Sequence, residues 1–136
     1  INNYKTIKIM KKFFLVSLVL AFFGIAANAQ PQGLLGTWKG TTVEVVANGE
    51  VLMSMNCDAA GMYLKFTFKP NGAAYGEIEI EGERETQKLT YKVSGTKILV
   101  TDEGGETQPF TYSNGKLYME EQEDGMDMRI YFKKQQ

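Results

Sequence analysis

The stretch Met62-Tyr63-Leu64-Lys65-Phe66-Thr67-Phe68 decides the fold class, because large apolar residues alternate with more polar ones along it. A period of two places the four side chains at 62, 64, 66 and 68 on one face of a β-strand and the other three on the opposite face. The Asn71-Gly72 pair that follows is typical of a tight turn, since both residues adopt positive φ readily. The stretch therefore predicts a half-buried strand that leads into a hairpin.

The same pattern repeats on both sides of this stretch. Short runs rich in Thr, Val, Ile, Tyr and Phe alternate with glycine-containing turns, and no window keeps a 3.6-residue period over the length of a helix. The other turn signals are Asn48-Gly49, Gly82, Ser94-Gly95, Gly104-Gly105, Asn114-Gly115 and Asp124-Gly125. We predict strands at 36–46, 62–69, 73–81, 84–93, 97–102, 107–113, 116–121 and 126–133.

These strands predict an all-β fold, an antiparallel up-and-down meander barrel of about eight strands. A closed barrel of this kind needs an even number, because its first and last strands pair antiparallel. Residues 51–56 could form a ninth strand, so we interpret 47–61 as a long connection. Its apolar Val51, Leu52, Met53 and Met55 would fold over one barrel end as a lid. The alternative, that they extend the first hairpin, stays open.

A secretory signal is expected ahead of the barrel. Met10-Lys11-Lys12 is basic, residues 13–25 are mostly apolar, and Ala27-Asn28-Ala29 offers the small residues that a signal peptidase recognises. The apolar run is shorter than the ~20 residues of a transmembrane helix, so we expect no membrane anchor after cleavage. We predict upstream residues and a signal-peptide helix at 1–29, a domain at 30–136, and export to the periplasm or the cell exterior.

Composition excludes several function classes. The sequence has no histidine, which removes Ser-His-Asp triads, Cys-His pairs and histidine-based zinc sites. No nucleophile has a base beside it, so we expect no enzyme, no catalytic residue, no metal and no cofactor. All acidic residues follow the predicted signal, so the mature chain is more acidic than the net charge of −1 suggests. That balance argues against nucleic acid and anionic lipid as partners.

The segment Leu34-Leu35-Gly36-Thr37-Trp38 opens the first predicted strand. A Gly-x-Trp there, a large first loop, short hairpins and a basic residue on the last strand resemble the lipocalins, and most closely the small secreted lipocalin-like domains of Gram-negative bacteria. The layout matches over essentially the whole mature chain, although this chain is shorter than a typical lipocalin and lacks its C-terminal helix and disulfide. The resemblance implies a calycin-type β-barrel closed at one end by Gly36, Trp38 and a cation across the indole ring. Arg129 is the better match for that cation, with Lys133 second.

The barrel and the resemblance lead to one main functional hypothesis: a monomeric, non-enzymatic carrier that holds a small hydrophobic ligand inside the barrel. Entry would lie under the predicted lid. The candidate ligand-binding residues are the bulky apolar side chains expected on inward faces or in the lid, namely Met53, Met55, Phe66, Phe68, Ile78, Tyr91, Phe110, Tyr112 and Met128. Flexible methionine side chains suit an adaptable apolar pocket, although methionine is equally an ordinary core residue.

Two observations keep an alternative open. The interior of an eight-stranded barrel is just wide enough for side chains to fill, and the candidate residues are bulky. The domain would then be a packed interaction module that binds protein or glycan through its loops or outer face. The glutamates at 77, 79, 81, 83 and 85 follow strand alternation around Gly82, and we interpret them as a solvated face with Arg84, Lys88 and Lys92 as partners. A glycosidase pair would need carboxyl groups that converge in a cleft.

Overall fold

The alternating runs form β-strands throughout the part of the chain that the structure, a computed structural model, describes: residue 31 and residues 33–136. The strands are β1 (Gly36–Ala47), β2 (Glu50–Asn56), β3 (Met62–Phe68), β4 (Ala73–Ile80), β5 (Glu83–Ser94), β6 (Lys97–Thr101), β7 (Thr107–Ser113), β8 (Lys116–Glu123) and β9 (Met126–Lys134). A short 3-10 helix, η3 (Pro70–Gly72), joins β3 to β4. Within these residues no helix has the length and apolar character needed to cross a bilayer. The expected signal peptide at 1–29 lies outside them.

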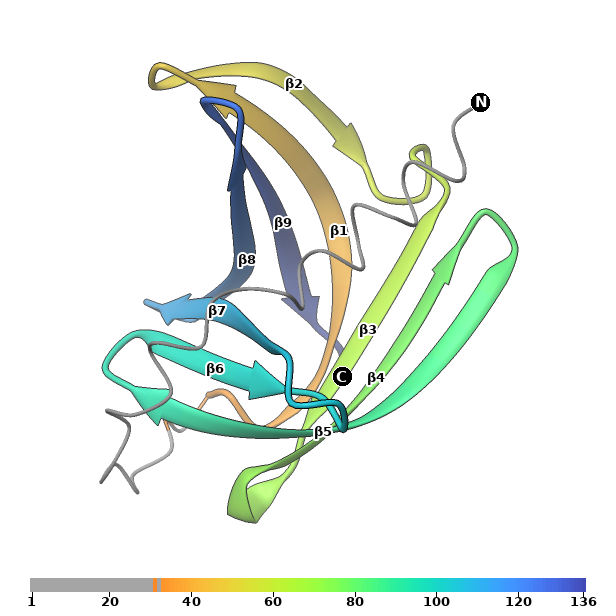
Figure 1. Ribbon diagram of the computed structural model, residues 1–136, viewed down its shortest axis with the longest axis vertical. Helices are drawn as coiled ribbons and strands as arrows, with labels where there is room; N and C mark the ends of the chain where they lie inside the picture. The colour runs from red at the N-terminus through yellow and green to blue at the C-terminus, as the bar shows by residue number, and fades with distance from the viewer. Residues whose placement is uncertain (1–30, 32) are drawn as a thin grey trace.

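Eight of the strands close into an antiparallel barrel (Figure 1). From β3 onward each strand pairs with the next along the chain, and β1 completes the ring by pairing with both β3 and β9. The closing pair is antiparallel, which is why the number of strands in the ring is even. The predicted all-β, up-and-down barrel of eight strands is therefore confirmed.

The ninth strand, β2, shows that the lid prediction is wrong. It pairs antiparallel with residues 42–47 of β1, whereas β3 pairs with residues 36–39 of the same strand. β2 and β3 thus occupy successive lengths of one edge of β1. Residues 50–56 extend the first hairpin. In this position β1 provides partners for the backbone hydrogen-bonding groups of β2, which an isolated lid would leave unpaired.

The two ends of the barrel differ. At the end where β1 begins, which we call the Trp38 end, the barrel is closed by side chains. At the other end, β8 continues to Glu123 although its pairing with β7 stops at Phe110 and Met119. Residues 42–47, 50–56, 120–123 and 126–131 therefore continue as a sheet of their own, which we call the extension, and this end we call the flared end (Figure 1).

Aromatic side chains fill the middle of the barrel. The ring of Phe66 packs edge to face against Phe110 and Phe132, with centroid distances of 5.2 and 5.6 Å. Phe68 packs in the same way against Tyr91 at 5.1 Å. Edge-to-face contacts are a preferred arrangement of aromatic rings and stabilise a core beyond the apolar area that they bury. We call these five side chains the ring cluster.

Candidate functional site

Trp38 plugs the Trp38 end from inside. Its side chain is 3% exposed, its indole Nε1 donates a hydrogen bond to the Leu34 carbonyl at 2.9 Å, and the ring of Tyr112 meets it edge-on at 5.9 Å. Gly36 has a φ of 125°, a conformation that favours glycine, and so allows the chain to turn from Leu34 into β1. Both residues of the Gly-x-Trp motif therefore serve the packing at this end.

The cation over Trp38 is Lys134, so the choice of Arg129, or of Lys133 second, is wrong. The Lys134 Nζ lies 5.7 Å from the centroid of the Trp38 ring, and Trp38 and Lys134 are directly opposed in the β1–β9 ladder. Arg129 lies five residues earlier on β9, about 16 Å away at ~3.3 Å per residue. Arg129 and Lys133 also alternate with the buried Ile130 and Phe132, which places them on the outer face.

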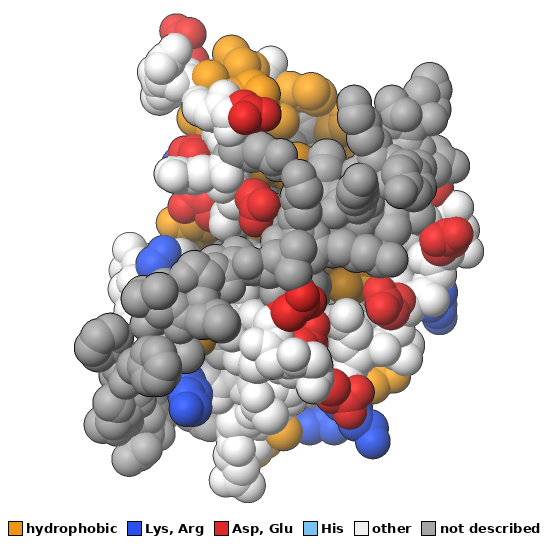
Figure 2. All heavy atoms as spheres, viewed as in Figure 1, with side chains coloured by type: hydrophobic (Ala, Val, Ile, Leu, Met, Phe, Trp, Pro, Cys, Tyr) orange, Lys and Arg blue, Asp and Glu red, His pale blue; other side chains and the backbone are white. Residues whose placement is uncertain are grey.

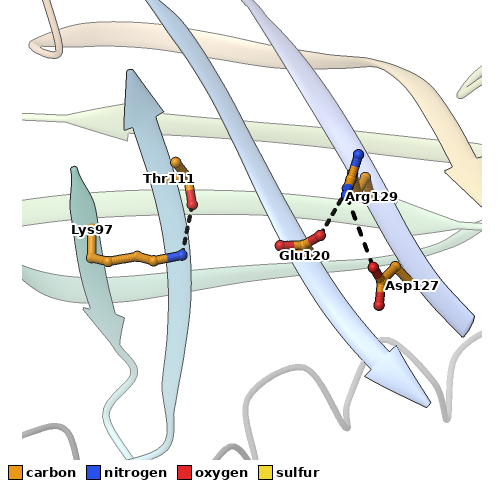
Figure 3. Close-up of polar contacts among 5 residues, drawn as sticks. All are labelled: Lys97, Thr111, Glu120, Asp127 and Arg129. Atoms are coloured by element: carbon orange, nitrogen blue, oxygen red, sulfur yellow. Dashed lines mark hydrogen bonds and ion pairs between the residues drawn. The ribbon is translucent and has the colours of Figure 1, made fainter. Parts of the chain in front are cut away.

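Arg129 instead belongs to an outer-face ion pair (Figure 3). Its Nε lies 2.7 Å from the Glu120 carboxylate on β8, and its Nη2 lies 3.9 Å from Asp127. The hydrogen bond to Glu120 raises the pKa of the Arg129 guanidinium further above its ordinary value. This cluster joins two strands of the extension on the side away from the barrel interior.

Four of the predicted ligand-binding residues lie in the ring cluster. Phe66, Phe68 and Phe110 are at most 1% exposed, and Tyr91 is 5% exposed. The Tyr91 hydroxyl donates to the Lys69 carbonyl at 2.6 Å, and burial raises the pKa of that phenol. These side chains face inward as expected, but they contact one another, so a ligand that reached them would first have to separate them. Their contact with a ligand stays a prediction.

Two more of the predicted ligand-binding residues are not accessible from the flared end. Tyr112 is half-buried at the Trp38 end, against Trp38. Ile78 on β4 is 7% exposed and stands opposite the buried Leu64 of β3. Neither faces solvent at the flared end, so a ligand there would reach Ile78 only by penetrating the barrel.

The remaining three, Met53, Met55 and Met128, come together on the inner face of the extension. Val43 of β1 stands between Met55 on β2 and the fully buried Ile130 on β9, and Val45 stands between Met53 and Met128 in the same way. Directly paired residues of antiparallel strands point to one face. Met53 and Met55 are 49% and 38% exposed, and Met126, two residues before Met128, is 42% exposed. Figure 2 shows hydrophobic side chains gathered over β2 at the flared end. We call Met53, Met55, Met126 and Met128 the methionine face.

Two glutamines on the inner face were not among the predicted site residues. Gln108 is 0% exposed, and it stands opposite Val100 and two residues before Phe110. Gln87 stands opposite Gly76, which itself pairs with Phe66. The Oε1 atoms of both glutamines are buried and have no hydrogen-bond partner among the described residues. The alternation that identified Leu89, Tyr91 and Phe110 includes both positions, so the pattern could have found them.

The acidic run divides between the two faces. On β4, Glu79 is on the outer face and binds Arg84 at 3.0 Å, in agreement with the expected solvated face. On β5, however, Glu83 and Glu85 are opposite Ile80 and Ile78, which puts them on the inner face near the flared end, where both are exposed. In the described part of the chain, no cluster of acidic or cysteine side chains has the geometry to hold a metal ion.

Cys57 is a buried thiol beside the wall of β1. It is 1% exposed, and a Cβ on Gly40 would lie 3.4 Å from its Sγ. Burial, and next to it the charge of Asp58, raise the pKa of the Cys57 thiol to about 11. A thiol that stays protonated at neutral pH is a poor nucleophile, so this residue contributes packing at this position.

Comparison with known proteins agrees with the architecture. The family model for a lipocalin-like domain matches residues 34–119, which is more than half of the chain. No curated protein and no solved structure gave a significant match. The matched range begins at the Leu34 that accepts the Trp38 hydrogen bond and includes β1 to β7 and the start of β8. The chain belongs to the lipocalin-like domain family.

Proposed function

We propose that this protein is a non-enzymatic, exported lipocalin-like protein that binds a small hydrophobic ligand at the flared end of its barrel. Binding of a ligand in general is what the lipocalin-like barrel suggests. The observation that carries the more specific proposal is the methionine face, four flexible apolar side chains on the inner face of the extension. Methionine adapts to ligands of different shape, which suits a site of broad specificity.

The ring cluster refines which residues we expect to contact the ligand. Its side chains already fill the barrel between the Trp38 end and the middle. Displacing a buried phenylalanine would cost several kcal/mol, about as much as an apolar ligand of modest size gains. Met53, Met55 and Met126, which are exposed, bear no such cost, because a ligand that covers them removes apolar area from water without separating the side chains of the ring cluster.

A fluorescent apolar probe tests the proposal. We would titrate the protein with N-phenyl-1-naphthylamine, follow probe emission, and measure the melting temperature over the same concentrations. Binding to the folded state must raise the melting temperature by mass action. The Met53→Gln and Met128→Gln variants should each weaken binding by about fivefold, since each removes roughly 1 kcal/mol of apolar contact.

Glu79→Gln is the matched control, because Glu79 lies on the outer face with Arg84 as its partner. It should leave probe affinity unchanged. A saturating probe that never shifts the melting temperature, or equal affinities in the methionine variants and the control, would contradict binding at the methionine face.

A second candidate function is an interaction module, and one feature favours it. Among the described strands β2 has only β1 as a neighbour, so its other edge presents free backbone groups beside Val51 and Leu52, which are 55% and 58% exposed. Such an edge is a place where another chain can add a strand. Gel filtration and cross-linking distinguish the two candidates. Leu52→Asp should abolish a complex of this kind and leave probe binding intact, because Leu52 has no partner in the β1–β2 ladder and is not a member of the methionine face.

A further inference from the structure

The side-chain amide of Gln108 uses its NH2 group in a hydrogen bond, whereas its carbonyl oxygen has no partner among the described residues. Its Nε2 donates to the Pro109 carbonyl at 3.1 Å, which fixes the orientation of the amide. Its Oε1 is buried and has no partner among the described residues. Buried polar atoms in folded proteins almost always have a partner, because an unpaired acceptor loses its hydration without compensation. This oxygen therefore calls for a donor that the described chain does not provide.

The position of Gln108 places that oxygen at the boundary between core and flared end. On β7 it is the first inward residue beyond Phe110, the last member of the ring cluster on that strand. Gln87 has the corresponding position on β5, since Leu89 on one side is buried and Glu85 on the other is exposed. Its Oε1 is likewise buried without a partner among the described residues. β5 and β7, which are not neighbours in the barrel, thus each place a buried acceptor oxygen at the limit of the packed core.

The charged side chains at the flared end also favour a hydrogen-bond donor over a carboxylate. Glu83 and Glu85 are exposed on the inner face of β5, opposite Ile80 and Ile78. The inner-face positions of β5, from residue 83 to residue 93, include no lysine or arginine, and Arg84 is turned to the outer face by Glu79. A ligand carboxylate would approach like charges here, whereas an ammonium or an uncharged donor would not.

We propose that the ligand is an amphiphile whose head group is a hydrogen-bond donor, an alcohol or an ammonium, that binds Gln108 Oε1 while its apolar chain lies against the methionine face. This inference rests on the proposed function and specifies its ligand class. It predicts discrimination against fatty acids, whose carboxylate offers no proton to Gln108 at neutral pH and meets the glutamates on the inner face.

Three ligands of equal chain length test the head group. Isothermal titration calorimetry at pH 7.4 would compare 1-decanol below its solubility limit with decylamine and decanoate below their critical micelle concentrations, using the protein after removal of the signal segment. The alcohol and the amine should each bind at least tenfold more tightly than decanoate, since a satisfied buried acceptor is worth about one order of magnitude in affinity. Decanol that binds no more tightly than decanoate would overturn the inference.

Variants test whether Gln108 and the inner-face glutamates cause the preference for a donor head group. Gln108→Leu keeps the size of the side chain and removes the acceptor, so it should weaken decanol binding by about tenfold and leave decanoate unchanged. The paired change Glu83→Gln with Glu85→Gln should strengthen decanoate binding alone. Gln122→Leu, on the outer face opposite Asp127, is the matched control and should alter neither ligand. If Gln108→Leu does not fold, Gln87→Leu and the glutamate variants still test the preference.

The outcomes also separate this inference from the proposed function. If neither N-phenyl-1-naphthylamine nor any decyl compound binds, the proposed function fails and this inference fails with it. If the probe binds at the methionine face while the decyl compounds show no preference among head groups, or if Gln108→Leu and Gln87→Leu both leave that preference intact, only the assignment of the donor head group is wrong. A water molecule then satisfies Gln108.

Discussion

Lys134 and Trp38 are directly opposed across the closing ladder of the barrel, and the Lys134 ammonium lies over the indole ring with Nζ 5.7 Å from its centroid. The same Nζ donates to the Gly33 carbonyl at 2.8 Å. Through Lys134, β9 thus contacts both Trp38 and the segment that precedes β1. A Cβ on Gly36 would come within 2.9 Å of the Lys134 Cε, so the glycine of the motif also makes room for the lysine stem.

This arrangement predicts energetic coupling between Trp38 and Lys134. Trp38→Ala should lower the free energy of unfolding by ~3–5 kcal/mol, the usual effect of removing a large buried aromatic. Lys134→Met should lower it by about 0.5–1 kcal/mol, because it keeps apolar stem contacts and loses the cation. Urea melts of both variants and the double variant should give a coupling energy of at least 0.5 kcal/mol.

Arg129→Met is the control for that cycle. Arg129 binds Glu120 and Asp127 on the outer face, so its effect and that of Trp38→Ala should simply add. Coupling of Trp38 to Arg129 but not to Lys134 would contradict the assignment.

The core and the methionine face should respond differently to truncation. Phe66→Ala removes a fully buried ring that contacts Phe110 and Phe132, and it should cost ~3–5 kcal/mol in the free energy of unfolding. Met53→Ala, at a half-exposed position, should cost less than about 0.5 kcal/mol. Denaturant melts measure both. A Met53→Ala variant as unstable as Phe66→Ala would mean that the methionine face is part of the core.

The raised pKa of the buried Cys57 thiol predicts a loss of stability at alkaline pH. In the folded state its pKa is raised from 9.0 to about 11, so the unfolded chain loses this proton first as the pH rises. The stability that the protonated thiol contributes is fully present below pH 9 and declines between about pH 9 and 11. Burial raises the pKa of Tyr91 as well, with the same sign, so the difference between wild type and Cys57→Ala isolates the thiol.

Urea melts from pH 7 to 11 measure this difference, and native Cys57 should also react slowly with a thiol reagent at pH 8. Equal pH dependence in wild type and Cys57→Ala, together with rapid labelling of the folded protein, would show that the thiol is accessible.

The proposed export predicts a defined N-terminus for the mature chain. Intact mass and N-terminal sequencing of protein from a Gram-negative expression host should show cleavage between Ala29 and Gln30, because this bond follows the small-x-small triplet after the apolar run. Ala29→Leu should block or shift the cleavage. A mature protein that keeps residues 13–25 would contradict both the signal peptide and the exported location.

Much of the fold was readable from the sequence because its determinants are local. The period of two in Met62–Phe68 and in the other runs assigned the strands and most inner faces, and the Asn-Gly and Asp-Gly pairs placed the hairpins. Antiparallel closure then required an even ring, which β1 and β9 complete. These steps need only neighbouring residues and the geometry of a strand.

The details of the candidate site depend on pairing between distant strands, and the sequence does not contain that register in local form. The bulge at Thr41 shifts β1 against β9 by one residue and so places Lys134 opposite Trp38. Whether residues 50–56 pair with β1 or fold over the barrel depends on which backbone groups are left free after closure. Likewise, Phe66 and Met53 have similar apolar character, and only the packing of the ring cluster separates a filled core from an exposed face. Sequence periodicity therefore determined which side of most strands faces inward, whereas tertiary register and packing decided which inward side chains remain accessible to a ligand.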